Sequence, residues 1–149
     1  MVDKSRLIYE VIGKMHTKVV NNGNLEDTLQ ECFNILTEYC NVENIICWYL
    51  NAKNEKFHPL YFMSNYDFTK LRYNLNDSIL GQVFKSDLSN INTNYSKGND
   101  TQIDELFGDN EVVSIVTIPL LTKINKYGCL QFINTKSKGK LSDEEIELD

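Results

Sequence analysis

The sequence contains little proline, glycine or histidine: its 149 residues include 2 Pro, 7 Gly and 2 His. So few Pro and Gly residues exclude a collagen-like chain or one dominated by flexible linkers. Positive charge is also scarce, because 15 Lys and Arg stand against 21 Asp and Glu, which gives a formal net charge of −6. A chain with this balance has no excess of cations to displace the counterions of a phosphate backbone. We therefore expect no nucleic-acid partner.

A long hydrophobic run is absent as well. The longest apolar stretch, Val112–Leu121, is interrupted by Ser114, Thr117 and Pro119, and it has about half of the ~20 residues that a membrane-spanning helix needs. The first residues of the chain are not followed by the apolar segment of a signal peptide. These absences predict a cytoplasmic protein, and we expect the 149 residues of this chain to make no membrane contact.

The four cysteines show none of the close spacings of a metal site, and neither histidine is near a cysteine in the sequence. A zinc site needs several convergent nitrogen and sulfur ligands, so we predict no metal. Each cysteine has apolar neighbours, which suit an inert buried side chain in a reducing compartment better than a reactive thiol. The residues concerned are Cys32, Cys40, Cys47, Cys129, His16 and His58.

The composition that remains is that of a globular protein. Hydrophobic residues make up 42% of the chain and charged residues 24%, close to the averages for folded domains. A chain of this length fits one domain and can bury enough surface to fold without disulfides.

Two amphipathic helices are expected at the start of the chain. The first ends at Asn21-Asn22-Gly23, and the second begins after Asn24, a residue type that favours the N-cap position. The apolar residues at helical spacing are Leu7, Ile8, Val11, Ile12, Met15 and Val19 in the first helix, and Leu25, Leu29, Phe33, Leu36 and Cys40 in the second.

The period of the pattern then changes to that of β-strands. Asn44–Leu50 is apolar on both faces and indicates a central strand, and Phe57–Met63 is its expected hairpin partner, broken or bulged near Pro59. Val112–Leu121 shows the strongest strand pattern of the chain, and Cys129–Asn134 is expected to pair with it as a second hairpin.

A helical insertion separates the two hairpins. We expect Ser78 to cap a short helix, Leu88–Ile91 to form a brief strand, and Ile103–Phe107 to form one or two helical turns. A capping box at Ser142–Glu145 predicts the start of a final helix, and because the chain stops soon afterwards we expect a fragment of a longer protein. This order of elements favours an α+β domain, an antiparallel sheet with helices on its faces.

Three segments, in this order, resemble the motifs of the GAF domain family. Ser78–Ser86 is similar to the family's Gly-x-x-Gly-x-Val turn and helix, with Ser78 in place of the earlier glycine. Ser114–Leu120 is similar to its Ser-x-Leu-x-Val-Pro-Leu strand. Gly128–Asn134, followed by Leu141–Glu145, resembles its closing Gly-Val-Leu-x-x-x-Asn strand and acidic helix start. The resemblance extends from Asn24 to the end of the chain.

Three residues of these segments also have roles that follow from backbone geometry. Gly81 would let a helix start close against a strand. Pro119 is expected at a bulge or an edge, where its missing N–H is harmless. Gly128 is expected to relieve the turn before the last strand.

The resemblance implies a GAF-like α+β fold, similar to profilin and PAS domains. Its central antiparallel sheet has about six strands, with helices on one face and a pocket-forming helical insertion on the other. On this basis residues 1–22 are a candidate dimerisation and signalling helix, which could equally cover the domain's own sheet. Residues 23–149 are then the GAF domain, truncated in its C-terminal helix.

The subclasses of the family differ in the cofactor that they hold. Members that bind a bilin attach it through a cysteine next to a histidine, and no such pair occurs in this sequence. A haem would need an axial ligand, and His16 and His58 are the only histidines. We therefore predict neither bilin nor haem.

Two further subclasses match the sequence only in part. Members that bind cyclic nucleotides carry an Asn-Lys…Phe…Asp-Glu signature, but here Thr135 follows Asn134 and Leu141 replaces the phenylalanine, so a cyclic nucleotide is a less favoured ligand. The free methionine sulfoxide reductases need a cysteine near the glycine turn, where this chain has Ser78–Gly81. We predict no catalytic residue and no enzymatic activity.

The resemblance places a ligand pocket between the sheet and the insertion. An apolar, aromatic cavity with few charges would suit a small neutral or weakly polar metabolite, although large aromatics are also ordinary core residues. The candidate lining residues are Trp48, Phe62, Phe84, Ile91, Phe107 and Thr117.

The leading hypothesis is a non-catalytic, small-molecule-sensing GAF domain of a bacterial signalling protein. It would form a homodimer through its terminal helices and couple its ligand or dimer state to an output domain, such as a kinase, diguanylate cyclase, phosphodiesterase or transcription regulator. The alternative is a structural dimerisation module without a ligand. A less favoured alternative is an enzyme similar to free methionine sulfoxide reductase.

Overall fold

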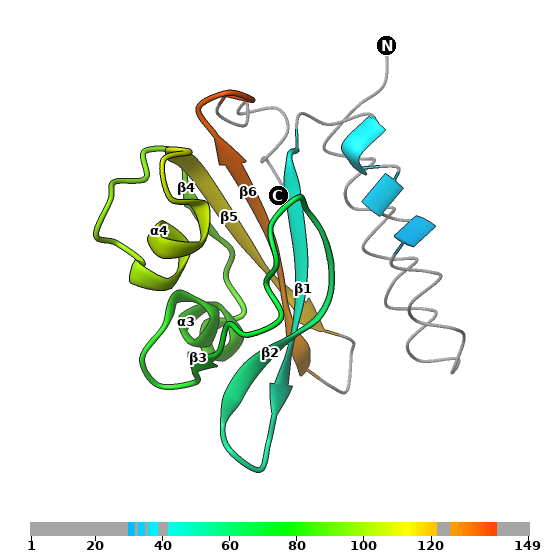
Figure 1. The fold of residues 1–149 in the computed structure, drawn as a ribbon. Helices are drawn as coiled ribbons and strands as arrows, with labels where there is room; N and C mark the ends of the chain where they lie inside the picture. Colours follow the sequence, from blue (N-terminus) through cyan, green and yellow to red (C-terminus); the bar gives the residue numbers. More distant parts are fainter. Residues whose placement is uncertain (1–29, 32, 35, 39–41, 122–125, 140–149) are drawn as a thin grey trace.

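The centre of the molecule is a six-stranded antiparallel sheet with the strand order β3-β2-β1-β6-β5-β4 (Figure 1). The computed structural model describes residues 30–31, 33–34, 36–38, 42–121 and 126–139. The labelled elements are β1 (Asn44–Asn51), β2 (Lys56–Met63), β3 (Tyr73–Asn74), α3 (Ile79–Ser86), β4 (Asn90–Asn92), α4 (Thr101–Phe107), β5 (Val112–Leu121) and β6 (Lys126–Thr135).

Helical segments lie on both faces of the sheet. The described helical residues between 30 and 38 pack on one face, and α3 and α4 lie on the other (Figure 1). Phe33 and Leu36 are fully buried, which confirms the predicted apolar stripe at these two positions. The first predicted helix and the capping box at Ser142–Glu145 lie outside the described residues.

The two predicted hairpins are confirmed. Pro59 pairs with Trp48 and Tyr61 pairs with Cys47, so the register shifts by one residue and β2 is bulged beside Pro59, as expected. β5 has the bounds that the apolar pattern predicts. Pro119 lies in β5 beyond the last residue that pairs with β4, and its missing N–H therefore faces no strand on that side.

The structure corrects the sequence-based prediction at three places. β3 was not predicted, because a strand of two residues has no periodicity to detect. The strand predicted at Leu88–Ile91 begins only at Asn90, and Leu88 is exposed. Gly128 lies inside β6 and not in the turn before it. A Cβ atom on Gly128 would lie 1.8 Å from the carbonyl oxygen of Trp48, so glycine is needed here for the close approach of β1.

The insertion predicted between the hairpins is present. Ser78 caps α3, where its hydroxyl accepts a hydrogen bond from the backbone N–H of Gly81 at 3.1 Å. A Cβ atom on Gly81 would lie 1.8 Å from the carbonyl oxygen of Leu75, so glycine is needed for a close approach, but the neighbour is the loop after β3 and not the strand that we expected. None of the described helices is both long enough and apolar enough to span a bilayer.

Candidate functional site

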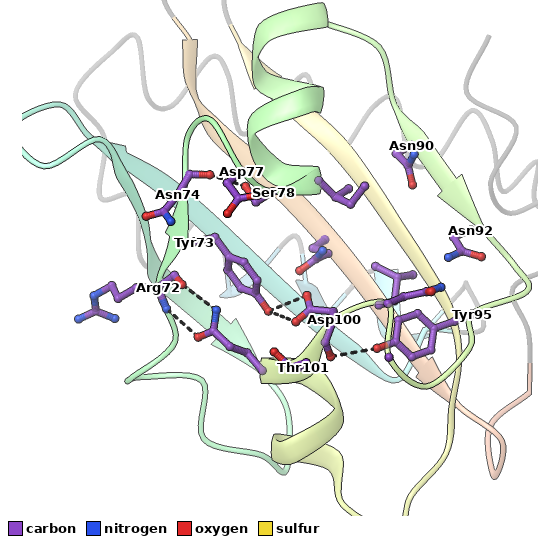
Figure 2. A pocket seen from close by; sticks show the side chains of 16 residues that line it. Arg72, Tyr73, Asn74, Asp77, Ser78, Asn90, Asn92, Tyr95, Asp100 and Thr101 are labelled. Carbon is purple, nitrogen blue, oxygen red and sulfur yellow. Dashed lines mark hydrogen bonds between the residues drawn. The ribbon is translucent and has the colours of Figure 1, made fainter.

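A cavity of about 520 Å³ lies between the sheet and the insertion, on the side of α3 and α4 (Figure 2). β3 and the loop before α3 form one side, and β4, the loop after it and the start of α4 form the other. The floor is formed by Ile115 of β5 and Gln131 of β6. The remaining lining residues are Arg72, Tyr73, Asn74, Asp77, Ser78, Ile79, Asn90, Asn92, Tyr95, Gly98, Asn99, Asp100, Thr101 and Gln102.

The floor of the cavity contains a buried and oriented carboxamide. Gln131 is 5% exposed, and its Oε1 accepts a hydrogen bond of 3.0 Å from Nε1 of Trp48. Its Nε2 donates to Oγ1 of Thr117 at 3.2 Å. Because an indole nitrogen can only donate, the first bond determines which end of the amide is the oxygen. The Gln131 side chain is therefore held in one orientation between the neighbouring strands β1 and β5.

Two tyrosines connect the wall of the cavity to α4. The hydroxyl of Tyr73 donates to the carboxylate of Asp100, with oxygen–oxygen distances of 2.9 and 2.8 Å. Asp100 is also the N-cap of α4 and accepts from the N–H of Ile103. The hydroxyl of Tyr95 lies 2.7 Å from Oδ1 of Asp104, one turn further along the helix. These bonds position the start of α4 against the cavity.

The carboxylates behind this wall make the local field negative. Burial, followed by the charge of Asp100, raises the pKa of Tyr73 well above its ordinary value. Burial, followed by the hydrogen bond to Asp104, raises the pKa of Tyr95 in the same direction. Both hydroxyls are protonated donors at neutral pH, as in ordinary tyrosines, and the raised pKa keeps them so into the alkaline range.

The backbone of Arg72 belongs to the wall of the cavity, but its charged guanidinium is not directed into the cavity. Its Nη1 donates to the carbonyl oxygens of Thr69 and Leu71 at 2.8 and 2.7 Å, and the guanidinium points away from the cavity (Figure 2). The side chain of Gln102 bonds both backbone groups of Arg72, with its Nε2 donating at 2.8 Å and its Oε1 accepting at 3.3 Å. This pair ties the start of α4 to the end of the loop that precedes β3.

Searches for relatives by sequence find none: no protein-family model matches the chain, and no curated protein matches it. Solved structures do match. The chain superposes with a TM-score of 0.71 and 14% identity on a GAF domain from a phosphoenolpyruvate-protein phosphotransferase of Coxiella burnetii, over 97% of this chain and 86% of that one. The fold is that of a GAF domain.

Two other solved structures show the range of proteins that share this GAF fold. One is the free methionine-R-sulfoxide reductase of Neisseria meningitidis, with a TM-score of 0.68 and 13% identity over 98% of this chain and 83% of that one. The other is the GAF domain of the A. aeolicus protein nlh2, with a TM-score of 0.62 and 15% identity over 93% and 83% of the two chains. At these identities the likeness shows the fold and not the function.

None of the six pocket residues predicted from the GAF resemblance lines the cavity. Trp48 and Thr117 lie beneath the floor and contact Gln131 through the hydrogen bonds described above. Phe62 and Phe84 pack against the hydrophobic core. Phe107 is buried and also lines a second cavity of about 280 Å³. Ile91 is 46% exposed on β4. That these side chains contact a ligand stays a prediction.

Most residues that line the cavity are polar, which differs from the apolar, aromatic cavity that we expected. Trp48 and the phenylalanines are buried in or pack against the core, and the lining has Tyr73, Tyr95 and asparagines from β3 and β4. Sequence reasoning missed Asn74, Asn90 and Asn92, because asparagine between regular elements usually marks turns and caps. A signal did exist for Gln131, which is the one strongly polar residue in the apolar run Cys129–Ile133.

The two described cysteines are unsuited to redox chemistry with each other. Burial raises the pKa of the Cys47 thiol to about 12, and burial together with the nearby Cys47 raises that of Cys129 to about 12. Cys47 pairs with Leu130 and Trp48 pairs with Cys129. Because side chains alternate along a strand, the two thiols lie on opposite faces of the sheet. Cys32 and Cys40 lie outside the described residues.

The one histidine among the described residues, His58, does not line the cavity. His58 is half-buried on β2, and its ring lies 5.4 Å from that of Tyr49. Burial, followed by the charges of Arg72 and Lys56, lowers its pKa. Within the described ranges no three His, Cys, Asp or Glu side chains converge as metal ligands would. His16 lies outside those ranges.

Proposed function

We propose that this chain is a small-molecule-sensing regulatory GAF domain of a larger bacterial signalling protein, without catalytic activity of its own. The observation that carries the proposal is the 520 Å³ cavity with the buried, oriented carboxamide of Gln131 on its floor. Its volume is typical of sites that enclose a metabolite. A fixed polar group on the floor supplies the orientation that such sites give to their ligands.

The role of the domain in a larger protein is proposed from its relatives in structure. The Coxiella structure is a GAF domain from a phosphotransferase, and a further match from Geobacter sulfurreducens is described as a GAF domain/HD domain protein. By analogy, the terminal helices would form a cytoplasmic homodimer and transmit the state of the cavity to an output domain. The proposal requires no bilin, haem, metal, membrane or nucleic acid.

A thermal-shift screen tests whether the cavity binds a ligand. A ligand that binds only the folded state raises the Tm, so at least one compound of a broad library of polar metabolites and cyclic nucleotides should do so. Asn90→Trp would fill the cavity from β4 and should abolish the shift. Asn94→Trp is the matched control, because Asn94 is exposed and does not line the cavity. Binding that survives Asn90→Trp unchanged would contradict a ligand site here.

The two other hypotheses are outcomes of the same screen. A chain that is dimeric by light scattering and whose Tm no compound changes would support a structural dimerisation module. The reductase hypothesis has the likeness to the Neisseria enzyme in its favour. It predicts thiol-dependent reduction of free methionine-R-sulfoxide, and that activity would overturn the proposal.

A further inference from the structure

The amide of Gln131 has hydrogen-bonding capacity that the protein does not use. A carboxamide has two N–H donors and an oxygen with two lone pairs. Trp48 occupies one lone pair and Thr117 accepts from one N–H, which leaves one donor and one acceptor at the cavity floor. Held in one orientation, such a group can form two parallel hydrogen bonds to a ligand edge that offers an acceptor beside a donor. Amides, lactams and nucleobases have that edge, as in the bidentate contacts of Gln with adenine.

The charges around the cavity do not favour an ionic ligand. The guanidinium of Arg72 points away and is bonded to backbone carbonyls, so no cation of the lining is directed at an anion. The hydroxyl of Tyr73 donates its one proton to the carboxylate of Asp100, whose two oxygens lie 2.9 and 2.8 Å away. Asp77 is exposed, where water and salt screen its charge. An anion would therefore face a negative wall, and a cation would find no buried, unpaired carboxylate.

Side-chain amides of β3 and β4 surround the rest of the cavity. Asn90 and Asn92 are half-buried on one side, and Asn74 lies on the other (Figure 2). Oδ1 of Asn92 accepts from the N–H of Asn94 at 3.0 Å, which directs its Nδ2 as the available donor. Amide groups in this arrangement match hydroxyl and carbonyl groups of an uncharged ligand.

We propose that the cavity binds an uncharged ligand whose amide-type edge, that of a nucleobase, lactam or primary carboxamide, pairs with Gln131, while the asparagines bind its other polar groups. This inference rests on the proposed function and names the ligand class of the same site. It excludes nucleotides, in which a phosphate would enter the negative part of the cavity.

Pairs of probes that differ in one feature test the ligand class by isothermal titration calorimetry. Uridine should bind, whereas N3-methyluridine lacks the donor of the edge, and uridine monophosphate adds a negative charge. Nicotinamide and nicotinate form a second pair, an amide against a carboxylate of the same shape. Ribose offers hydroxyl groups without an amide edge. Uridine should bind at least about tenfold more tightly than N3-methyluridine, uridine monophosphate or ribose, and nicotinamide should bind at least about tenfold more tightly than nicotinate. A factor of ten corresponds to about 1.4 kcal/mol.

A conservative variant tests the role of Gln131 itself. As a carboxylate, Gln131→Glu can accept from Nε1 of Trp48 and from the hydroxyl of Thr117, but it has no donor for a ligand and adds a negative charge at the floor. The amide probes should bind it about tenfold more weakly or worse. Gln82→Glu makes the same change at an exposed position of α3 and should leave binding unchanged. If Gln131→Glu fails to fold, the comparison of uridine with N3-methyluridine on the wild-type chain tests the same donor.

The outcomes separate this inference from the proposed function. Equal or tighter binding of nucleotides, nicotinate or ribose would overturn the ligand class and leave a sensing cavity in place. Absence of binding by every amide probe up to about 10 mM would also overturn it, and the broad metabolite screen would then decide the proposed function independently. Tight binding of the amide probes to the wild type, together with weaker binding to Gln131→Glu, would support both the ligand class and the proposed function.

Discussion

The floor and the wall of the cavity are built by different interactions. The floor lies on the strands β1, β5 and β6, which we count as part of it, and their buried apolar side chains include Ile46, Trp48 and Ile133. The wall, residues 72–102, depends on directed hydrogen bonds such as those of Tyr73 to Asp100. Apolar burial contributes about 25 cal/mol per Å² over a large area, whereas a single hydrogen bond adds about 1 kcal/mol. We infer that the floor determines stability and the wall determines the shape offered to a ligand.

The largest expected effect is that of a methyl group placed in the floor. In Gly128→Ala the new Cβ would lie 1.8 Å from the carbonyl oxygen of Trp48, so β1 and β6 would have to separate. We expect a loss of about 3 kcal/mol or more in the free energy of unfolding, measured by urea denaturation. Gly98→Ala in the wall meets no atom within 4 Å and should cost about 1 kcal/mol, because only its positive φ is unfavourable. Similar losses of unfolding free energy in Gly128→Ala and Gly98→Ala would contradict the inference that the floor determines stability.

Alkaline pH should affect Cys47 of β1, on the sheet face opposite to the cavity, before it affects the wall. The pKa of Cys47 is raised from 9.0 to about 12 in the folded state, so the fold favours the neutral thiol. The stability that the neutral Cys47 thiol contributes is fully present below pH 9 and is lost as the pH rises toward 12. At pH 10 the free energy of unfolding should be lower by about 1.4 kcal/mol. The pKa of Tyr73 starts from 10.0, so its loss begins only at higher pH.

The variant Cys47→Ala isolates this effect. Urea denaturation of the wild type and the variant at pH 8 and pH 10 should show a smaller loss of stability in the variant. An equal loss in both chains would show that Cys47 ionises in the folded state.

Removal of the indole N–H should have an intermediate effect. Trp48→Phe leaves Oε1 of Gln131 without its donor and also removes part of a fully buried ring, which together should cost about 2 kcal/mol or more in urea denaturation. Tyr49→Phe changes the next residue of β1, which is half-buried, and should cost less than about 0.5 kcal/mol. A negligible cost of Trp48→Phe would mean that the amide of Gln131 is not held by this bond.

The smallest effect on global stability is expected in the wall. Tyr73→Phe removes the hydroxyl that binds Asp100 and should lower the free energy of unfolding by about 1 kcal/mol. Hydrogen exchange should nevertheless show faster exchange at the start of α4, for example at the N–H of Ile103. Tyr61→Phe on β2 is the control, and it should leave exchange at Ile103 unchanged. A global loss in Tyr73→Phe as large as that of Gly128→Ala would show that floor and wall are one cooperative unit.

The floor could be predicted from the sequence and most of the wall could not. Val112–Leu121 and the strand at Asn44 have largely apolar, β-branched runs that favour buried strands, and the structure confirms both strands. The cavity depends on side chains such as Tyr73 of β3 and Asn90 of β4, which lie on strands at opposite ends of the sheet order and line the same cavity. These strands have two and three residues, too few to show a periodic pattern. That both strands border one cavity follows from tertiary packing, which a local pattern does not encode.

The emission of Trp48 offers the most direct test that this cavity senses a ligand. Trp48 is the only tryptophan of the chain, and its indole N–H is bound to the carboxamide at the cavity floor. A compound that raises the Tm by binding in the cavity should also change the wavelength or intensity of this emission, with the same concentration dependence. A compound that stabilises the chain while the emission of Trp48 stays unchanged would contradict a ligand site on Gln131.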